Sequence, residues 1–538
     1  MLAWTIYISF LGVAVLLLLP AANARAARSV ALISAVAGFF AALGGVFQSS
    51  AGQVQTVTRI AWIPALGIDY HLAADGISLV LVLLTGLAAI AGILFSWNVE
   101  HRAKEFFAFY LALIGGVYGV FLSFDLFLLF VFYELAIIPK YFLIAIWGST
   151  RKEYGAMKLA LYSFIGSAMV LVGLIAAYVV AGAKTMSLFE LAKFPFPQSF
   201  QMWAFPLVFV GFAILAGLWP FHTWAPTGHV AAPTAASMLL AGVVMKLGAY
   251  GCLRVALTLF PHGLDPWYVA SYRPHFMQSV MSHSVIENIQ WVLHLVGFGS
   301  WREVFGVLAV IGIVYGAMVA LVQKDFKFVI GYSSVSHMGF VLLGLVALNE
   351  GNEFGLSGAV LQMFSHGVIA GLLFAVVGRM VYDRAHTREL AELHAMNLGK
   401  LLPFASITFT IACVASMGLP GFSGFVAELQ VLVGAWHTSP TLAVFAGLGV
   451  LIGVAYTLRA LQLAFFPDRE TQASGPEPGD GVGGHGQLEP ISIPERVGAV
   501  LLIGASLVVG LCPRLLLDLI VPSFRSELFE NLRKAGGL

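Results

Sequence analysis

Ionisable side chains stand inside long apolar runs of this chain. Glu134 is flanked on both sides by aliphatic and aromatic residues, and Lys246 follows the apolar run LLAGVVM. On insertion scales a charge at the centre of a membrane helix costs at least about 2.5 to 3.5 kcal/mol, so such residues usually serve a function. A carboxylate and an amine in separate helices can pass protons, because the charge of one changes the proton affinity of the other. The pattern therefore predicts proton transfer.

Four further residues join these two as candidates. Glu428 follows a glycine- and proline-rich break, and His337 and His366 lie in two later apolar runs, where an imidazole can take up and release a proton near neutral pH. Lys140 stands six residues after Glu134, about 240° around a helix, so the two would meet only through long side chains or a bridging water molecule. Alternatively, Lys140 lies near a helix end and extends its amine to the lipid headgroups. The candidate set is Glu134, Lys140, Lys246, His337, His366 and Glu428.

The sequence shows no motif that would bind a redox cofactor or a metal ion. Cys252, Cys413 and Cys512 lie far apart, and none belongs to a C-x-x-C motif. No apolar run carries two or three metal ligands at helical spacing, and a haem held by His337 and His366 would require a second redox centre. We therefore expect no cofactor and no metal in this chain, and any linked redox chemistry in another chain.

The composition places these residues in a membrane protein. Of 538 residues, 59% are hydrophobic and 10% are charged, whereas soluble domains carry about 25% charged residues. Apolar runs of bilayer length, roughly 17 to 25 residues, predict an all-α membrane protein of about fourteen transmembrane helices. We place the helices near 2–22, 29–47, 76–97, 106–124, 126–147, 156–182, 203–219, 230–257, 303–323, 327–348, 356–382, 402–435, 442–466 and 495–512. The first run has no basic region before it, so we interpret it as a helix and not as a cleaved signal.

Basic residues are distributed unevenly between the predicted loops. Loops after odd-numbered helices hold sixteen lysines and arginines, and those after even-numbered helices hold six. This bias predicts that the odd loops face the cytoplasm and that both termini face outward. A fifteenth span at 275–299 would reverse the later loops, so we predict an interfacial amphipathic helix there. The Gly- and Pro-rich stretch 468–495 is typical of a flexible loop.

Two predicted helices are broken. The seventh meets Gly217, Pro220 and Pro226, and the twelfth contains MGLPGFSG at 417–424. Each break falls on the fourth helix of a five-helix unit if helices 4–8 and 9–13 form two units, and the odd helix count inverts the second unit. Matched breaks in inverted repeats indicate an ion path.

The expected organisation follows from these spans. We divide the chain into N-terminal helices 1–3 (1–100), a first repeat (101–258), an external loop with an interfacial helix (259–302), a second inverted repeat (303–466), a flexible cytoplasmic loop (467–494), and helix 14 with a C-terminal amphipathic tail (495–538).

Several motifs resemble one family closely. They are SFDLFL at 123–128 before Glu134, PFHTW at 220–224, APTAAS at 232–237 before Lys246, YSSVSHMG at 332–339, AHTR at 385–388, and GLPG at 418–421 before Glu428. They are similar to the antiporter-like M-type (chain 4-type) subunits of proton-pumping NADH:quinone oxidoreductase, respiratory complex I, over nearly the whole chain.

The resemblance implies a membrane-arm channel subunit in the inner (plasma) membrane of a bacterium. It would move protons through the buried Glu, Lys and His residues with energy from electron transfer in other subunits, and Glu428 would face the exit side. The expected partners are other membrane-arm subunits, including neighbouring antiporter-like ones, and the lipid bilayer, but no nucleic acid.

This sequence departs from the family pattern in two places. A lysine usually stands five residues before the proline of P-x-H-x-W, where this chain has Leu215, and the usual intervening proline is Gly217. We hypothesise that Lys140 supplies the missing positive charge. The 260–302 insertion is also longer than expected. Alternatives left open are a multisubunit cation/proton antiporter, a membrane-bound hydrogenase, and a structural spacer without conduction.

Overall fold

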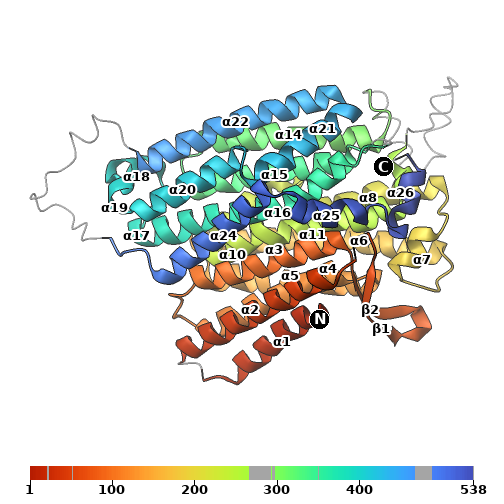
Figure 1. Ribbon diagram of the computed structural model, residues 1–538, viewed down its shortest axis with the longest axis horizontal. Coiled ribbons are helices and arrows are strands. Elements are labelled where there is room, and N and C mark those ends of the chain that lie inside the picture. The colour runs from red at the N-terminus through yellow and green to blue at the C-terminus, as the bar shows by residue number, and fades with distance from the viewer. Residues whose placement is uncertain are drawn as a thin grey trace, which may run out of the picture.

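The fold is a bundle of long helices that run roughly side by side, with short connections at both ends (Figure 1). The computed structural model describes residues 1–538 except 21–22, 51, 266–292, 294–296, 349–350, 467–487 and 537–538. The predicted interfacial helix at 275–299 and the predicted flexible loop therefore lie almost wholly outside the described residues.

Helices occupy every predicted span in the described part of the chain. Their bounds are α1 Ala3–Leu18, α2 Ala24–Gln48, α3 Gly76–Phe95, α4 Ala103–Leu122, α5 Leu126–Trp147, α6 Lys152–Val180, α8 Gln198–Ala216, α14 Trp301–Val322, α15 Phe326–Val346, α16 Phe354–Ala375, α20 Pro403–Ser416, α21 Ser423–Thr438, α22 Pro440–Phe465 and α24 Ile493–Leu511. Twelve helical stretches of the described residues are long and apolar enough to cross a membrane. The helical membrane class is confirmed, whereas the count of fourteen and the inverted repeats stay predictions.

The eighth predicted span changes its helical pitch along its length. It consists of α10 (Thr234–Leu239), a π-helical turn (Leu240–Val244), α11 (Met245–Gly251) and a second π-helical segment (Cys252–Leu257). A third π-helical segment, Val376–Tyr382, follows α16. These π segments were not predicted, because hydropathy reports the length of an apolar run and not its hydrogen-bond register. They are of interest since π turns are frequent at functional sites.

The core of the bundle lies around α3, α10, α11, α15 and α16. These helices are almost wholly buried, whereas α2, α22 and α24 leave most of their surface for lipid or partner chains. Three of the helix starts carry acidic caps, which accept hydrogen bonds from the first backbone N–H groups of a helix, because those groups lack carbonyl partners within it. Asp75, Asp125 and Asp325 accept such bonds at the starts of α3, α5 and α15.

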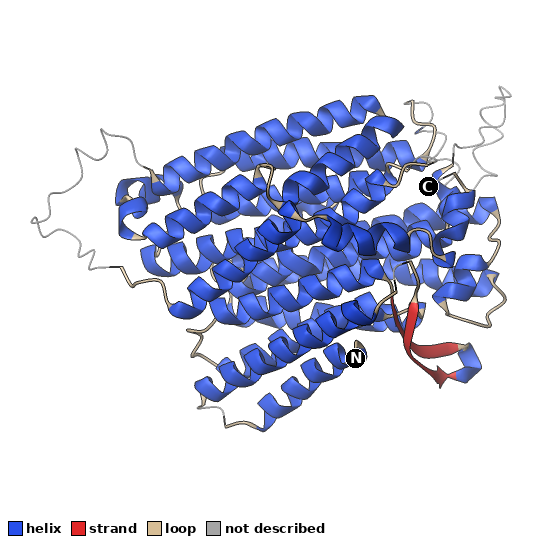
Figure 2. Ribbon diagram, in the orientation of Figure 1, coloured by secondary structure: helices blue, strands red, loops and turns tan. Residues whose placement is uncertain are grey.

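A β-hairpin leaves the bundle between α2 and α3 (Figure 2). Its strands, β1 (Gln55–Ile63) and β2 (Ile68–Ala74), pair antiparallel across a turn that ends at Gly67, whose φ of 64° suits glycine. The hairpin was not predicted, because its strands are far shorter than an apolar run of bilayer length, although TVTRIAWI is rich in the β-branched residues typical of strands. Burial, followed by the charge of Arg59, lowers the pKa of His71 in β2, whose ring lies against Phe189 and whose Nε2 is 3.3 Å from the hydroxyl of Thr56.

Short helices complete the described chain. They are α7 (Leu188–Lys193), α9 (Trp224–Ala231), α17 (Asp383–Ala385), α18 (Leu390–Met396), α19 (Leu398–Leu401), α25 (Arg514–Ser523) and α26 (Glu530–Lys534), and 3-10 turns lie at Pro64–Leu66, Phe221–Thr223, Pro261–Leu264 and Glu527–Phe529. The C-terminal tail predicted to be amphipathic forms α25 and α26, and α25 packs along α3.

Three of the predicted loop charges are buried in the structure. Arg254 lies in the second π segment, is fully buried, and pairs with Asp75 at the start of α3 at 2.7 Å. Lys327 donates to the carbonyl of Ala232 at 2.6 Å, and Arg384 lies 2.8 Å from a buried glutamate of α24. Placing Arg254 in a loop was therefore wrong. The basic bias persists without these three residues, and the orientation remains a prediction.

Both helix breaks fall where the sequence places them. α8 ends at Ala216, and Gly217 follows with a φ of 88°, a conformation that L side chains rarely adopt. The indole N–H of Trp224 in α9 donates to the carbonyl of Ile214 at 2.8 Å, which also accepts from the backbone N–H of Gly217, so α9 is tied to the last turn of α8 across the break. The second break separates α20 from α21, with Gly418 at φ 73° and Gly421 at φ 101°.

Candidate functional site

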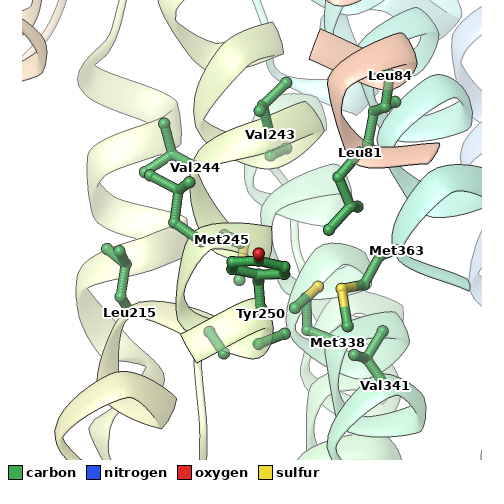
Figure 3. Close-up of a cluster of buried hydrophobic side chains, with 14 of the residues drawn as sticks. Leu81, Leu84, Leu215, Val243, Val244, Met245, Tyr250, Met338, Val341 and Met363 are labelled. Carbon is green, nitrogen blue, oxygen red and sulfur yellow. The ribbon is translucent and has the colours of Figure 1, made fainter. Parts of the chain in front are cut away.

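Lys246 lies in the centre of the core, directly after the first π turn. It is fully buried, and its Nζ lies 2.7 Å from Nδ1 of His366 on α16 and also contacts the carbonyl of Ala241. Figure 3 shows the apolar surroundings of this stretch, in which Val244 and Met245 lie near the end of α8. A buried amine needs such polar partners, because no water compensates its charge. Two of the six candidate residues, Lys246 and His366, are thus in direct contact.

A second contact joins His337 on α15 with Glu428 on α21. Their Nδ1 and Oε1 atoms lie 2.8 Å apart, and Gln362 of α16 donates to the same carboxylate oxygen at 2.9 Å. The ring centroids of His337 and His366 are 5.6 Å apart. The four residues therefore form a series that crosses the second half of the bundle in the order Lys246, His366, His337 and Glu428. We refer to these four residues as the central series.

A small cavity accompanies the central series. It is lined by polar groups of His337, His366, Glu428, Gln362, Ser365 and Ser416, and has about the volume of one water molecule, near 10 Å³. The Nε2 atom of His366 has no partner among the described residues. A water molecule in this cavity would complete the hydrogen-bonded path between the two imidazoles, so the arrangement suits proton transfer.

Glu134 and Lys140 lie on α5, apart from the central series. Lys140 is buried, and its Nζ donates to the hydroxyl of Ser163 on α6 at 3.3 Å. Glu134 is half-buried, and its Oε1 has no hydrogen-bond partner in the described part of the chain. The two side chains lie close enough for their charges to interact, although no direct ion pair joins them. Ser167, one helical turn from Ser163, faces Glu134, so α6 offers hydroxyl groups to both charges.

Leu215 occupies an apolar position on the last turn of α8. The backbones of α8 and α11 approach closely there: a Cβ on Gly248 would lie 2.5 Å from the backbone nitrogen of Ala216. Figure 3 shows Leu215 beside Val244 and Met245. A lysine at this position would stand against the helix of Lys246, whereas Lys140 approaches Glu134 from its own helix.

Two buried residues escaped the sequence analysis. His229 of α9 is fully buried, stacks on Phe374 at 4.8 Å between ring centroids, and feels the charges of both Lys246 and Lys327. Lys327, at the start of α15, donates hydrogen bonds from its amine to the backbone carbonyls of Val230 and Ala232. His229 falls between the predicted spans 203–219 and 230–257, and Lys327 was counted among the basic loop residues at the start of the tenth span. The sequence feature that could have identified His229 was its spacing of about two helical turns from His222.

The fold and the site together define a class: a multi-span helical membrane protein with titratable side chains aligned in its core. The comparisons with known proteins agree. Residues 123–284 and 275–453 match the family described as NADH:quinone oxidoreductase/Mrp antiporter, TM, and the chain belongs to this family.

Individual relatives refine the assignment. NADH-quinone oxidoreductase subunit M of Rhodobacter capsulatus is 35% identical over 95% of this chain and 92% of its own length. The solved respiratory complex I of Thermus thermophilus with bound NADH contains a chain that matches with a TM-score of 0.80 and 26% identity, over 100% of both chains. The Mrp complex of Dietzia sp. DQ12-45-1b matches with a TM-score of 0.77 at 19% identity, over 99% of this chain and 98% of that chain, which shows the fold alone.

These matches confirm the prediction of an M-type, antiporter-like subunit. The protein is a proton-translocating membrane-arm subunit of NADH:quinone oxidoreductase, and it assembles with other membrane-arm subunits. It is a multi-span membrane protein and its relatives are bacterial, which is consistent with a location in the inner membrane.

Proposed function

We propose that the central series is the path along which protons cross this subunit. The observation that carries the proposal is the alignment of these four side chains: hydrogen-bond contacts join Lys246 to His366 and His337 to Glu428, and the two imidazole rings between them lie 5.6 Å apart beside a small polar cavity. A proton on Lys246 can pass to the imidazole 2.7 Å away, and a neutral imidazole both accepts and donates. Glu428 lies on the half-helix after the second break and receives the proton last, toward the exit side.

In this proposal, the pair of Glu134 and Lys140 sets the charge on the side of the subunit where protons are taken up. Moving Glu134 between its ionised and neutral forms changes the field at the buried lysines, and so changes how readily they hold a proton. The mutual electrostatic effect of Glu134 and Lys140 supports this role. The α6 hydroxyl groups at Ser163 and Ser167 lie beside the two charges and offer a bridge between them.

Placement in the membrane forms part of the same proposal. We place the odd-numbered loops in the cytoplasm and both termini outside, on the basis of the basic residues, and treat 101–258 and 303–466 as inverted repeats, on the basis of the matched breaks. The neighbours would include further antiporter-like subunits. Redox chemistry would take place in other chains and transmit its energy to this one through electrostatic and packing changes.

Replacing Glu134 with glutamine tests whether the subunit conducts at all. We expect Glu134→Gln to lower proton translocation by the assembled complex several-fold, because a neutral amide cannot alternate its charge. The measurement is proton translocation per NADH oxidised in sealed membrane vesicles. Glu153→Gln, an exposed carboxylate at the start of α6, is the matched control and should pump normally. Normal pumping by Glu134→Gln would instead favour the structural spacer.

Lys140 is tested by its own substitution. We expect Lys140→Met to reduce pumping several-fold, because it removes the buried positive charge that acts on Glu134. Lys140→Met combined with Leu215→Lys should recover part of the rate, since it returns a lysine to the position usual in the family. Lys400→Met, at an exposed lysine, is the control. If Lys140→Met pumps like this control, the replacement hypothesis is wrong.

A further inference from the structure

A second small cavity lies beside the central series and shares one residue with the first. We call it the tyrosine cavity. Its polar lining consists of Ser333, Ser416, Tyr456 and Thr457, and it too has about the volume of one water molecule, near 10 Å³. Ser416, the last residue of α20, lines both cavities, and its hydroxyl lies 3.1 Å from Nε2 of His337. The hydroxyl of Ser416 thus stands between the tyrosine cavity and an imidazole of the central series.

The hydroxyl groups of Tyr456 and Ser333 form a short hydrogen bond in this cavity. Their oxygens lie 2.6 Å apart, one from α22 and one from α15, and both side chains are buried. Ser333 precedes His337 by one helical turn, so the two share a face of α15. The charge of Glu428 also acts on the hydroxyl of Tyr456. This buried tyrosine is therefore connected through hydroxyl groups to the charged centre of the bundle.

The tyrosine cavity lies between the central series and one end of the bundle. Along α15 the order from the helix start is Asp325, then Ser333, then His337, and along α22 Tyr456 precedes Arg459 toward the helix end. Arg459 caps this end, since its guanidinium donates to the carbonyls of Leu321 and Gln323 at 2.9 and 3.0 Å. This is the end with most of the basic loop residues.

We propose that Tyr456, Ser333 and Ser416 form a proton relay that supplies His337 and Glu428 from the basic end of the bundle, independently of Lys246. The relay rests on the proposed function of the central series. Each hydroxyl oxygen accepts one proton as its own proton moves to the next oxygen, and a water molecule in the tyrosine cavity bridges Tyr456 and Ser416. Ser416 then donates to the unprotonated Nε2 of His337. Each hydroxyl afterwards rotates back, so no group is oxidised or consumed.

The test removes one hydroxyl group from the relay in the intact complex. Tyr456→Phe should lower proton translocation per NADH oxidised about three- to tenfold, the effect of one lost hydrogen-bonded group. The solvent isotope effect on pumping, measured in H₂O and D₂O, should rise, because proton delivery becomes the slow step. Tyr110→Phe is the matched control: this buried tyrosine of α4 bonds only backbone carbonyls, and its variant should retain the normal rate and isotope effect.

Two serine variants keep the test decisive if Tyr456→Phe fails to assemble. Ser416→Ala removes the last hydroxyl before His337 and should show the same loss, whereas Ser416→Thr keeps a hydroxyl and should restore most of the rate. Equal pumping and equal isotope effects in Ser416→Ala and Ser416→Thr would overturn the relay, as would a Tyr456→Phe complex that behaves like Tyr110→Phe.

Glu428→Gln separates failure of the relay from failure of the proposed function. If Glu428→Gln lowers pumping and the relay variants do not, the central series stands and the relay is wrong. If neither has an effect, the central series itself is not the proton path.

Discussion

Replacing Lys246 with methionine is expected to lower coupled proton translocation at least about tenfold, which corresponds to about 1.4 kcal/mol or more in the limiting barrier. Lys246 is the only lysine of the described residues in contact with His366, and methionine fills a similar volume without an exchangeable proton. Its loss leaves Nδ1 of His366 facing an apolar side chain. Protons then have no titratable group at the Lys246 end through which to enter the central series.

A lysine-to-arginine variant distinguishes charge from proton exchange at the same position. Arginine keeps a positive charge but does not release its proton in proteins, so Lys246→Arg should also pump poorly if the amine must give up a proton. Proton uptake and NADH oxidation are measured together in sealed vesicles, with Lys534→Met, on the exposed C-terminal helix, as the control. A Lys246→Met complex that translocates protons at the control rate would show that the path avoids this helix.

Much of the fold follows from the sequence, because bilayer-length apolar runs leave few choices. Each predicted span corresponds to helical residues, and the breaks at Gly217 and at 417–424 are visible as glycine and proline clusters. The hairpin at 55–74 was not predicted, because its strands are much shorter than a membrane-spanning run. Likewise, hydropathy cannot show the π turn before Lys246, since it reports no hydrogen-bond register.

The candidate site was only partly predictable. Charges within apolar runs identified Lys246, His337, His366 and Glu428 one at a time, but the contact between Lys246 and His366 joins positions 120 residues apart and requires the packing of α10 and the first π-helical turn on α16. His229 was missed because it lies just before the predicted start of the eighth span at 230, whereas the structure places it in the buried helix α9. Arg254 was misplaced for a related reason: a charge near a helix end is usually solvated, and only its partner on α3 explains its burial.

The burial of Arg254 also indicates a division of labour between charges. The central series contains groups that can exchange protons near neutral pH, whereas arginine keeps its proton and therefore fits a fixed structural role. Arg254 lies 2.7 Å from Asp75, donates to the hydroxyl of Tyr250 at 3.0 Å, and stacks over Phe124 and Phe529. It thereby connects the start of α3, the eighth helix and the C-terminal tail.

Removing one member of this buried pair is expected to destabilise the subunit by about 3 to 5 kcal/mol, because the other charge stays buried without a partner. Arg254→Met and Asp75→Asn should each reduce the amount of complex that survives heating in detergent, and the double variant should recover part of the loss. The hairpin pair Arg59 and Asp69 is a matched control with the same 2.7 Å separation but with Arg59 half-exposed.

Arg59→Met should therefore cost no more than about 1 kcal/mol, as is usual for surface pairs. Survival after heating is measured for the four variants side by side with the unaltered complex. Equal survival of Arg254→Met and Arg59→Met would show that burial adds nothing to the pair. If Arg254→Met instead survives heating but loses proton translocation, the pair belongs to the conducting machinery and not to the packing of the C-terminal tail.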